Sequence, residues 1–169
     1  MVEGRSVFRE YFEALLIAGV FLGFANTFVL KTFYIPSSSM ENTLLVGDHL
    51  FVNRFVYGAA ASGLERSLLP GRAVKRGDIV IFRSVETPET DLVKRCVGLA
   101  GDTIELREAQ LYVNGVKVED GGLAIHRSPP APGDDPYRRE QKLRRDNVGP
   151  LRVPAEHYFC MGDNRDESY

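Results

Sequence analysis

The sequence predicts a mainly β protein, with a folded antiparallel, barrel-like β-sheet domain behind a single N-terminal transmembrane helix. Two observations lead to this prediction. One apolar stretch near the N-terminus is long enough for a membrane helix. The rest of the chain carries short runs rich in Val, Ile and Phe, separated by Gly-Asp and Asn-Gly turns. With 169 residues, of which 44% are hydrophobic and 26% charged, the chain can also bury a real core.

Residues 11–30 form the expected membrane anchor, because a helix of this length at about 1.5 Å per residue matches a hydrocarbon core of about 30 Å. Glu13 and Lys31 lie near its ends, where long side chains reach the membrane interfaces. A cleaved signal peptide would need small residues downstream, whereas residues 28–34 are bulky. A buried core helix remains the other alternative. Arg5 and Arg9 favour a cytoplasmic N-terminus, which predicts a single-pass protein of the inner (plasma) membrane with its β domain on the periplasmic or extracellular side.

The remainder of the chain is predicted to be strands and turns. Expected strands cover residues 50–56, 78–82, 92–97, 103–106, 110–113 and 116–118. Asn114-Gly115 is a strong hairpin signal. Residues 59–74 are typical of a surface loop, and the Pro-rich, charged residues 119–150 of an inserted variable lobe. The expected organisation is therefore a cytoplasmic N-terminus (1–10), an anchor (11–30), a catalytic β domain (31–118 and 151–169) and the lobe (119–150).

Charge and cysteine content exclude some classes of function. The net charge is −2 and no basic stripe is present, so the sequence offers nothing to a nucleic acid. Cys96 and Cys160 belong to no Cys-x-x-Cys or Cys/His cluster, so a zinc site is unsupported. Each stands in an apolar run that is typical of a small buried side chain. An external compartment would permit a disulfide between them, but the sequence does not require one.

A serine and a lysine are the candidate catalytic pair. Ser39 ends a three-serine loop directly after the anchor, and Lys94 stands in an apolar run. Such a lysine either faces solvent or points into an apolar pocket, where desolvation lowers its pKa and allows the amine to accept a proton. A serine hydroxyl needs an adjacent base. No histidine is suitably arranged, and we interpret all three as non-catalytic: His49, His126 and His157.

Four sequence blocks occur in order behind the apolar stretch. They are Pro36-Ser-Ser-Ser-Met40 with Thr43-Leu44, Arg76-Gly-Asp-Ile-Val80, Val93-Lys-Arg-Cys-Val-Gly98 with Gly101-Asp102, and Gly162-Asp-Asn-Arg-Asp166 with Ser168. This pattern resembles the bacterial type I signal peptidases, the Ser-Lys leader peptidases of peptidase family S26. The resemblance implies that Ser39 is the nucleophile, Lys94 the general base, Ser37 an oxyanion-hole donor and Ser168 the hydroxyl that orients the lysine amine.

The resemblance also implies an activity, which is removal of signal peptides from secretory preproteins by cleavage after a small-x-small motif at the outer membrane face. The implied partners are preproteins and the lipid bilayer, and the protein is expected to be a monomer that needs no metal or cofactor. Asp163 and Arg165 are expected to hold the loop beneath the pair by charge-assisted bonds. By matching position, the following residues would line two shallow apolar pockets for the substrate: Phe33, Ile35, Met40, Leu44, Leu50, Ile81, Leu92 and Val93.

Two features depart from the family pattern. Asn42 stands where the family usually has proline, and the chain stops at Tyr169 inside the last block, which implies a truncated chain. Two alternative functions remain open. One is a membrane-tethered, catalytically inactive β domain. The other is a self-cleaving Ser-Lys protease of the repressor type, although that class would carry a DNA-binding helical domain in place of the apolar stretch.

Overall fold

The structure is a computed structural model that describes residues 7–24, 30–53, 56, 72–119 and 121–168. The chain divides into two compact units. One unit comprises the described parts of residues 1–34 and 49–73, and the other comprises the described parts of residues 35–48 and 74–169.

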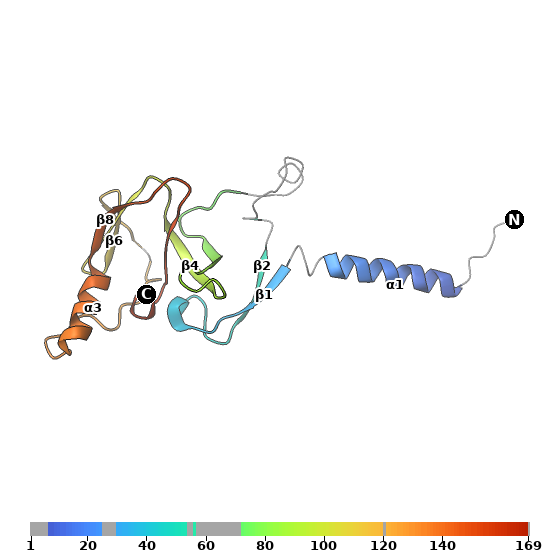
Figure 1. Ribbon diagram of the computed structural model, residues 1–169, viewed down its shortest axis with the longest axis horizontal. Coiled ribbons are helices and arrows are strands. Elements are labelled where there is room, and N and C mark those ends of the chain that lie inside the picture. The colour runs from blue at the N-terminus through green and yellow to red at the C-terminus, as the bar shows by residue number, and fades with distance from the viewer. Residues whose placement is uncertain (1–6, 25–29, 54–55, 57–71, 120, 169) are drawn as a thin grey trace. The chain divides into compact units, whose positions relative to one another are not determined.

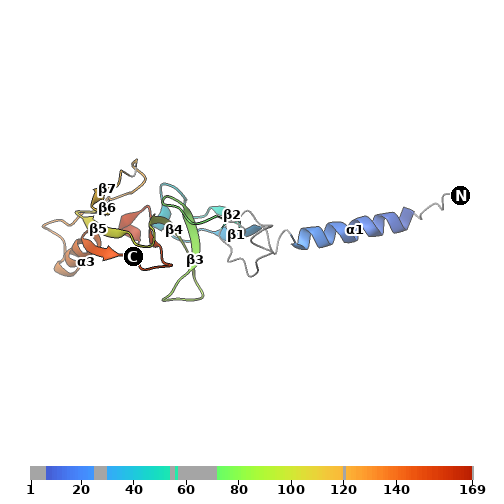
Figure 2. The ribbon, with the colours of Figure 1, turned by 90° about the horizontal axis from the view of Figure 1, so that it is seen from above.

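The first unit contains one helix and one pair of strands. Helix α1 spans Val7–Phe24, strand β1 spans Leu30–Tyr34, and strand β2 spans His49–Asn53. The two strands pair antiparallel, as Figures 1 and 2 show. The large apolar side chains of α1 are exposed along its length, and near its start Arg9 Nε donates to Glu13 Oε1 at 2.8 Å.

The predicted helix over residues 11–30 differs from the observed one. α1 is 18 residues long and ends at Phe24, and Leu30 already belongs to β1. The first half of α1 also carries three charged residues, Arg9, Glu10 and Glu13, which shorten its apolar run. Within the described residues, no helix combines the length and the apolar character needed to cross a membrane. Residues 25–29 of the predicted anchor lie outside the described part of the chain.

The second unit is built from two antiparallel sheets. Three strands form the order β3-β4-β9 and four form the order β7-β6-β5-β8. Their bounds are β3 Ile79–Arg83, β4 Asp91–Gly98, β5 Thr103–Arg107, β6 Gln110–Val113, β7 Val116–Lys117, β8 Val148–Arg152 and β9 Phe159–Met161. The expected strands from 78 to 118 and the Asn114-Gly115 hairpin are thus confirmed. The first expected strand ends at Asn53 in β2, and residues 54–55 lie outside the described part.

The mainly β, antiparallel class is confirmed, but the barrel-like closure is not observed among the described strands. They form three separate sheets of two, three and four strands. The strand order gives the physical reason. β4 is paired on both of its edges, with β3 and β9, so β5 cannot pair with it and instead pairs with β6 and β8 in a second sheet.

The core of the second unit follows from the period-2 pattern of β5 and β6. Ile104 and Leu106 are buried while Thr103 and Glu105 are not, since alternate side chains of a strand face opposite sides. The buried cluster consists of Ile104, Leu106, Leu111, Val113 and Val153. Phe159 and Met161 of β9 pack against it, so the same core supports the strand that leads into the last sequence block.

A helix that the sequence did not predict lies within the expected lobe. α3 spans Pro136–Asp146 and lies beside the β7-β6-β5-β8 sheet in both views (Figures 1 and 2). The Asp135 side chain caps it by accepting from the Arg138 N–H at 3.2 Å, and Pro136 occupies the first helical turn. Directly after α3, strand β8 pairs with β5. The expected surface loop at residues 59–74 lies mostly outside the described residues.

Candidate active site

Ser39 lies in a short 3₁₀ helix, η2 (Ser38–Met40). Its side chain is nearly buried, at 7% exposure, and the Met40 side chain beside it is completely buried. The Ser39 carbonyl oxygen accepts from the backbone N–H of Asn164 at 3.1 Å. The Oγ atoms of Ser37 and Ser39 are 3.4 Å apart. The two predicted serines of the first block therefore lie together, and the last block holds their loop in place.

Lys94 lies in the middle of β4, the central strand of its sheet, where its Cα pairs with Val80 of β3. Only 9% of this lysine is exposed. Burial lowers the pKa of Lys94 from its ordinary value, because an ammonium group is poorly solvated there. No charged side chain in the described part of the chain offsets this effect. Of the two interpretations open from the sequence, the structure supports the buried amine.

Gly162 brings the two predicted catalytic residues and Ser168 together. β9 pairs with β4 through Arg95 and Met161, so Gly162 follows opposite Lys94. The Gly162 N–H donates to Ser168 Oγ at 3.1 Å, at the end of the 3₁₀ helix η3 (Arg165–Glu167). A Cβ at Gly162 would collide with the Ser39 carbonyl oxygen and with Ser168 Oγ. η2 also lies against both β4 and η3. Three segments that are distant in sequence thus converge on one glycine.

A cluster of charged and polar side chains around Asp163 holds these segments together. Arg95 donates to both carboxylate oxygens of Asp163, at 2.8 and 2.7 Å, and to the Gly77 carbonyl at 2.7 Å. The Thr43 hydroxyl also donates to Asp163. Burial alone would raise the pKa of Asp163, but the hydrogen bonds from Arg95 and Thr43 outweigh it, and the pKa lies below its usual value. Because Arg95 follows Lys94 directly, this cluster fixes β4 relative to the serine loop.

Asp163 and Arg165 of the last block both make the expected charge-assisted hydrogen bonds. Asp163 binds Arg95 and Thr43, while Arg165 donates from Nε to the Gly162 carbonyl at 3.0 Å. Both side chains are buried, at 3% and 7% exposure.

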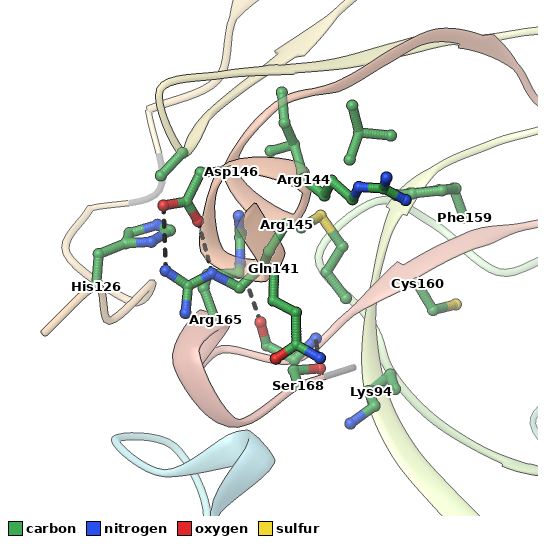
Figure 3. Close-up of a pocket in the computed structure, with 15 residues that line it drawn as sticks. Lys94, His126, Gln141, Arg144, Arg145, Asp146, Phe159, Cys160, Arg165 and Ser168 are labelled. Atoms are coloured by element: carbon green, nitrogen blue, oxygen red, sulfur yellow. Dashed lines mark hydrogen bonds and ion pairs between the residues drawn. The ribbon is translucent and has the colours of Figure 1, made fainter. Parts of the chain in front are cut away.

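A cavity of about 470 Å³ opens beside Lys94 and Ser168, which lie at the same end of it (Figure 3). Its lining mixes apolar side chains from the sheets with polar ones from α3; Ser39 does not belong to the lining. His126 also lines it, and burial lowers the pKa of this imidazole, which favours its neutral form. Within the described residues, no group of three or more His, Cys, Asp or Glu side chains could hold a metal ion.

The predicted substrate-pocket residues fall into three groups. Ile35 and Met40 are buried beside the serine loop, and Leu44 is half-buried. Ile81 and Val93 are paired and, by strand alternation, face the opposite side of the sheet from Lys94, whereas Leu92 faces the same side. The third group, Phe33 and Leu50, pair with each other in the first unit.

Three residues of the sequence blocks were given no role from the sequence. They are Gly162, Arg95 and Thr43, which position the candidate pair without chemical roles of their own. Gly162 belongs to one of the four sequence blocks, but the sequence does not show that the Ser39 backbone lies against this glycine. Nothing in the sequence pairs Arg95 with Asp163, which lies 68 residues further along the chain, and only the fold reveals this partner.

Comparison with known proteins identifies the family. The model of the family described as "Signal peptidase, peptidase S26" matches residues 8–169. The chain therefore belongs to this family. It is 36% identical to signal peptidase I of Pseudomonas aeruginosa, over 98% of this chain and 60% of the relative. It is 34% identical to signal peptidase I P of Bacillus subtilis subsp. natto, over 97% of this chain and 78% of the relative.

A solved structure is also similar in sequence. The crystal structure of a signal peptidase I from Enterococcus faecalis V583 is 31% identical, with a TM-score of 0.42, and the match covers 58% of this chain and 83% of that one. The chain spans 60% of the length of its relatives from Pseudomonas aeruginosa and Pseudomonas fluorescens.

Proposed function

We propose that this chain is a serine endopeptidase that removes signal peptides from secretory preproteins, with Ser39 as the nucleophile and Lys94 as the general base. The observation that carries the proposal is the burial of Lys94 on the strand beside the serine loop. An amine with a lowered pKa spends more of its time neutral, and only a neutral amine can accept the hydroxyl proton. Family membership and the names of the relatives support the same activity.

In the proposed reaction, neutral Lys94 accepts the Ser39 proton while Oγ attacks the scissile carbonyl carbon. The tetrahedral oxyanion is stabilised by the Ser39 backbone N–H and the Ser37 hydroxyl, which lies 3.4 Å from Ser39 Oγ. The lysine then gives its proton to the leaving amine as the C–N bond breaks. Water activated by the same lysine hydrolyses the acyl-enzyme, and no metal or cofactor takes part.

Ser168 has a positioning role in this proposal. Its Oγ accepts the Gly162 N–H at 3.1 Å, so the oxygen is held at the end of β9 next to Lys94. With the oxygen fixed in this way, the hydroxyl can orient the lysine amine toward Ser39. The lysine would otherwise sample several rotamers, since its stem has four flexible carbons.

The substrate specificity that we propose is cleavage after a small-x-small sequence. Buried Ile35 and Met40 next to Ser39 support it, because apolar walls packed this closely exclude large side chains. We further propose that the enzyme works as a monomer at the outer face of the inner (plasma) membrane, attached to the lipid through its N-terminal apolar segment. The side chains of Leu15, Phe21 and Leu22 on α1 are 73%, 70% and 71% exposed, and contact with lipid would bury this apolar surface.

The test is cleavage of a short peptide with Ala at both specificity positions. We expect cleavage after the second Ala, no cleavage when that residue is Phe, and loss of activity in Ser39→Ala and Lys94→Met. Ser38→Ala is the matched control, because Ser38 lies in the same 3₁₀ helix and has no part in the mechanism. If the chain leaves the peptide intact, or if Ser39→Ala cleaves as well as the wild type, the proposal is wrong and a binding domain without activity becomes the better account.

A further inference from the structure

The two cysteines lie directly opposite each other on neighbouring strands. The Cα of Cys96 in β4 pairs with the Cα of Cys160 in β9. The backbone N–H and carbonyl of Cys96 both bond away from β9, to Asp78 and Gly77 at 2.8 Å each. Cys96 and Cys160 therefore form a non-hydrogen-bonded pair, the type in which Cα atoms approach to about 4.5 Å and side chains are closest. Disulfides join Cα atoms roughly 4.4–6.8 Å apart, so this position suits one.

The two thiols face each other across this pair, because side chains of directly opposed residues lie on the same side of the sheet. The Cys96 thiol donates to the Gly98 carbonyl at 3.5 Å. Cys96 is completely buried, whereas Cys160 is half-buried and lines the cavity beside Lys94. A reagent can therefore reach Cys160 first, and Cys96 is placed to react only with Cys160.

We propose that Cys96 and Cys160 close into a disulfide across β4 and β9 when the chain meets a disulfide oxidant. Cys160 attacks the oxidant's disulfide, which forms a mixed disulfide and releases one thiol. Cys96 then attacks the Cys160 sulfur and releases the second thiol. Two protein thiols are oxidised to one disulfide, and one oxidant disulfide is reduced to two thiols. The proposed location outside the membrane supplies such an oxidant, and in this respect the inference rests on the proposed function.

The bond would form next to the candidate catalytic residues. Lys94 lies two residues before Cys96, and Gly162 lies two residues after Cys160. Because alternate residues of a strand share a face, all four lie on the same side of the sheet. The disulfide would therefore hold the register of β4 and β9 at the point where Gly162 brings Ser39 and Ser168 close to Lys94.

The surroundings of the thiols set the pace of the reaction. Burial raises the pKa of both thiols, that of Cys160 to about 11. The thiolate is the attacking species, so closure is slow near neutral pH and its rate rises about tenfold per pH unit below the pKa.

The experiment treats the reduced 169-residue chain with oxidised glutathione at pH 7, 8 and 9. Non-reducing peptide mapping by mass spectrometry then locates the sulfur bonds. We expect a linked pair of peptides containing Cys96 and Cys160, formed about tenfold faster at each higher pH. In Cys96→Ser, the remaining cysteine should stop at the glutathione adduct. Thermal unfolding should shift to higher temperature on oxidation of the wild type and not of Cys160→Ser.

This readout follows the sulfur atoms and needs no peptidase activity, so it fails or succeeds independently of the proposed function. The inference is overturned if both thiols of the wild type stay free at pH 9. It is equally overturned if the wild type accumulates a stable glutathione adduct on Cys160, or if the linked peptides come from two different chains.

Discussion

Replacement of Gly162 by alanine is the sharpest test of how the site is assembled. The added Cβ would lie 2.5 Å from Ser168 Oγ and 2.6 Å from Ser168 Cβ, and it would also collide with the Ser39 carbonyl oxygen. The serine loop must then move by about half an ångström, since real Cβ contacts are at least 3.0 Å. Overpacking of this kind costs about 1–3 kcal/mol of stability. A displacement of about 1 Å in a catalytic site can cost about 100-fold in rate, so we expect kcat/KM to fall about 10- to 100-fold.

Two other glycines serve as matched controls in the peptide-cleavage assay. A Cβ at Gly133 would meet nothing within 4 Å, so Gly133→Ala should change neither stability nor activity. A Cβ at Gly98 would lie 2.6 Å from the Ile104 side chain in the core, so Gly98→Ala should lose stability and keep its activity. The reasoning is refuted if Gly162→Ala cleaves within about twofold of the wild type. It is also refuted if Gly98→Ala is destabilised as much as Gly162→Ala and loses as much cleavage activity.

Three further predictions concern charged groups. Lys94→Met should abolish cleavage. In denaturant unfolding, however, it should be more stable than the wild type at pH values below the folded-state pKa of Lys94. This advantage in stability should shrink as the pH rises from that pKa toward 10.5, and a difference in stability that stays constant with pH would contradict the prediction. Arg95→Ala should lose about 3–5 kcal/mol of stability in the same assay, because it leaves the Asp163 carboxylate buried without its cation. Arg107 is exposed, so Arg107→Ala should lose little stability. Equal losses of stability in the two variants would contradict the argument. Hydrogen bonds hold the pKa of Asp102 at about 2, so relative to Asp102→Asn the wild type should lose about 1–2 kcal/mol as the pH falls from about 4 to 2, and parallel pH profiles would rule this out.

Local sequence features predict most of the strands because each feature has a local physical cause. The hairpin at Asn114-Gly115 follows from two consecutive residues that tolerate positive φ, which are observed at 54° and 78°. Alternation of apolar residues marks β5 and β6. Helix α3 escaped prediction because most of its residues are charged and few are apolar, although Asp135 followed by Pro136 is a start signal that could have revealed it.

The candidate site shows where a sequence stops being informative. The ordered blocks single out Ser39 and Lys94 as candidates, but the burial of Lys94 depends on strands that are far apart in the chain. The pairing of Cys96 with Cys160 is of the same kind, since strand register between distant segments is set by packing and not by local pattern. The ion pair between Arg95 and Asp163 was not predicted for the same reason, because the two residues are 68 positions apart in the chain.

Acylation of Ser39 as a function of pH tests the central claim most directly. The reagent is an activated ester of a small-x-small tripeptide, acetyl-Ala-Leu-Ala p-nitrophenyl ester, and peptide mapping locates the acyl group. The account predicts a single acyl group on Ser39 whose rate of formation rises as Lys94 loses its proton, below the ordinary lysine pKa of 10.5, and a slow rate without this rise in Lys94→Arg. An acyl group on another residue, or the same pH profile in Lys94→Arg, would contradict a Ser39–Lys94 dyad.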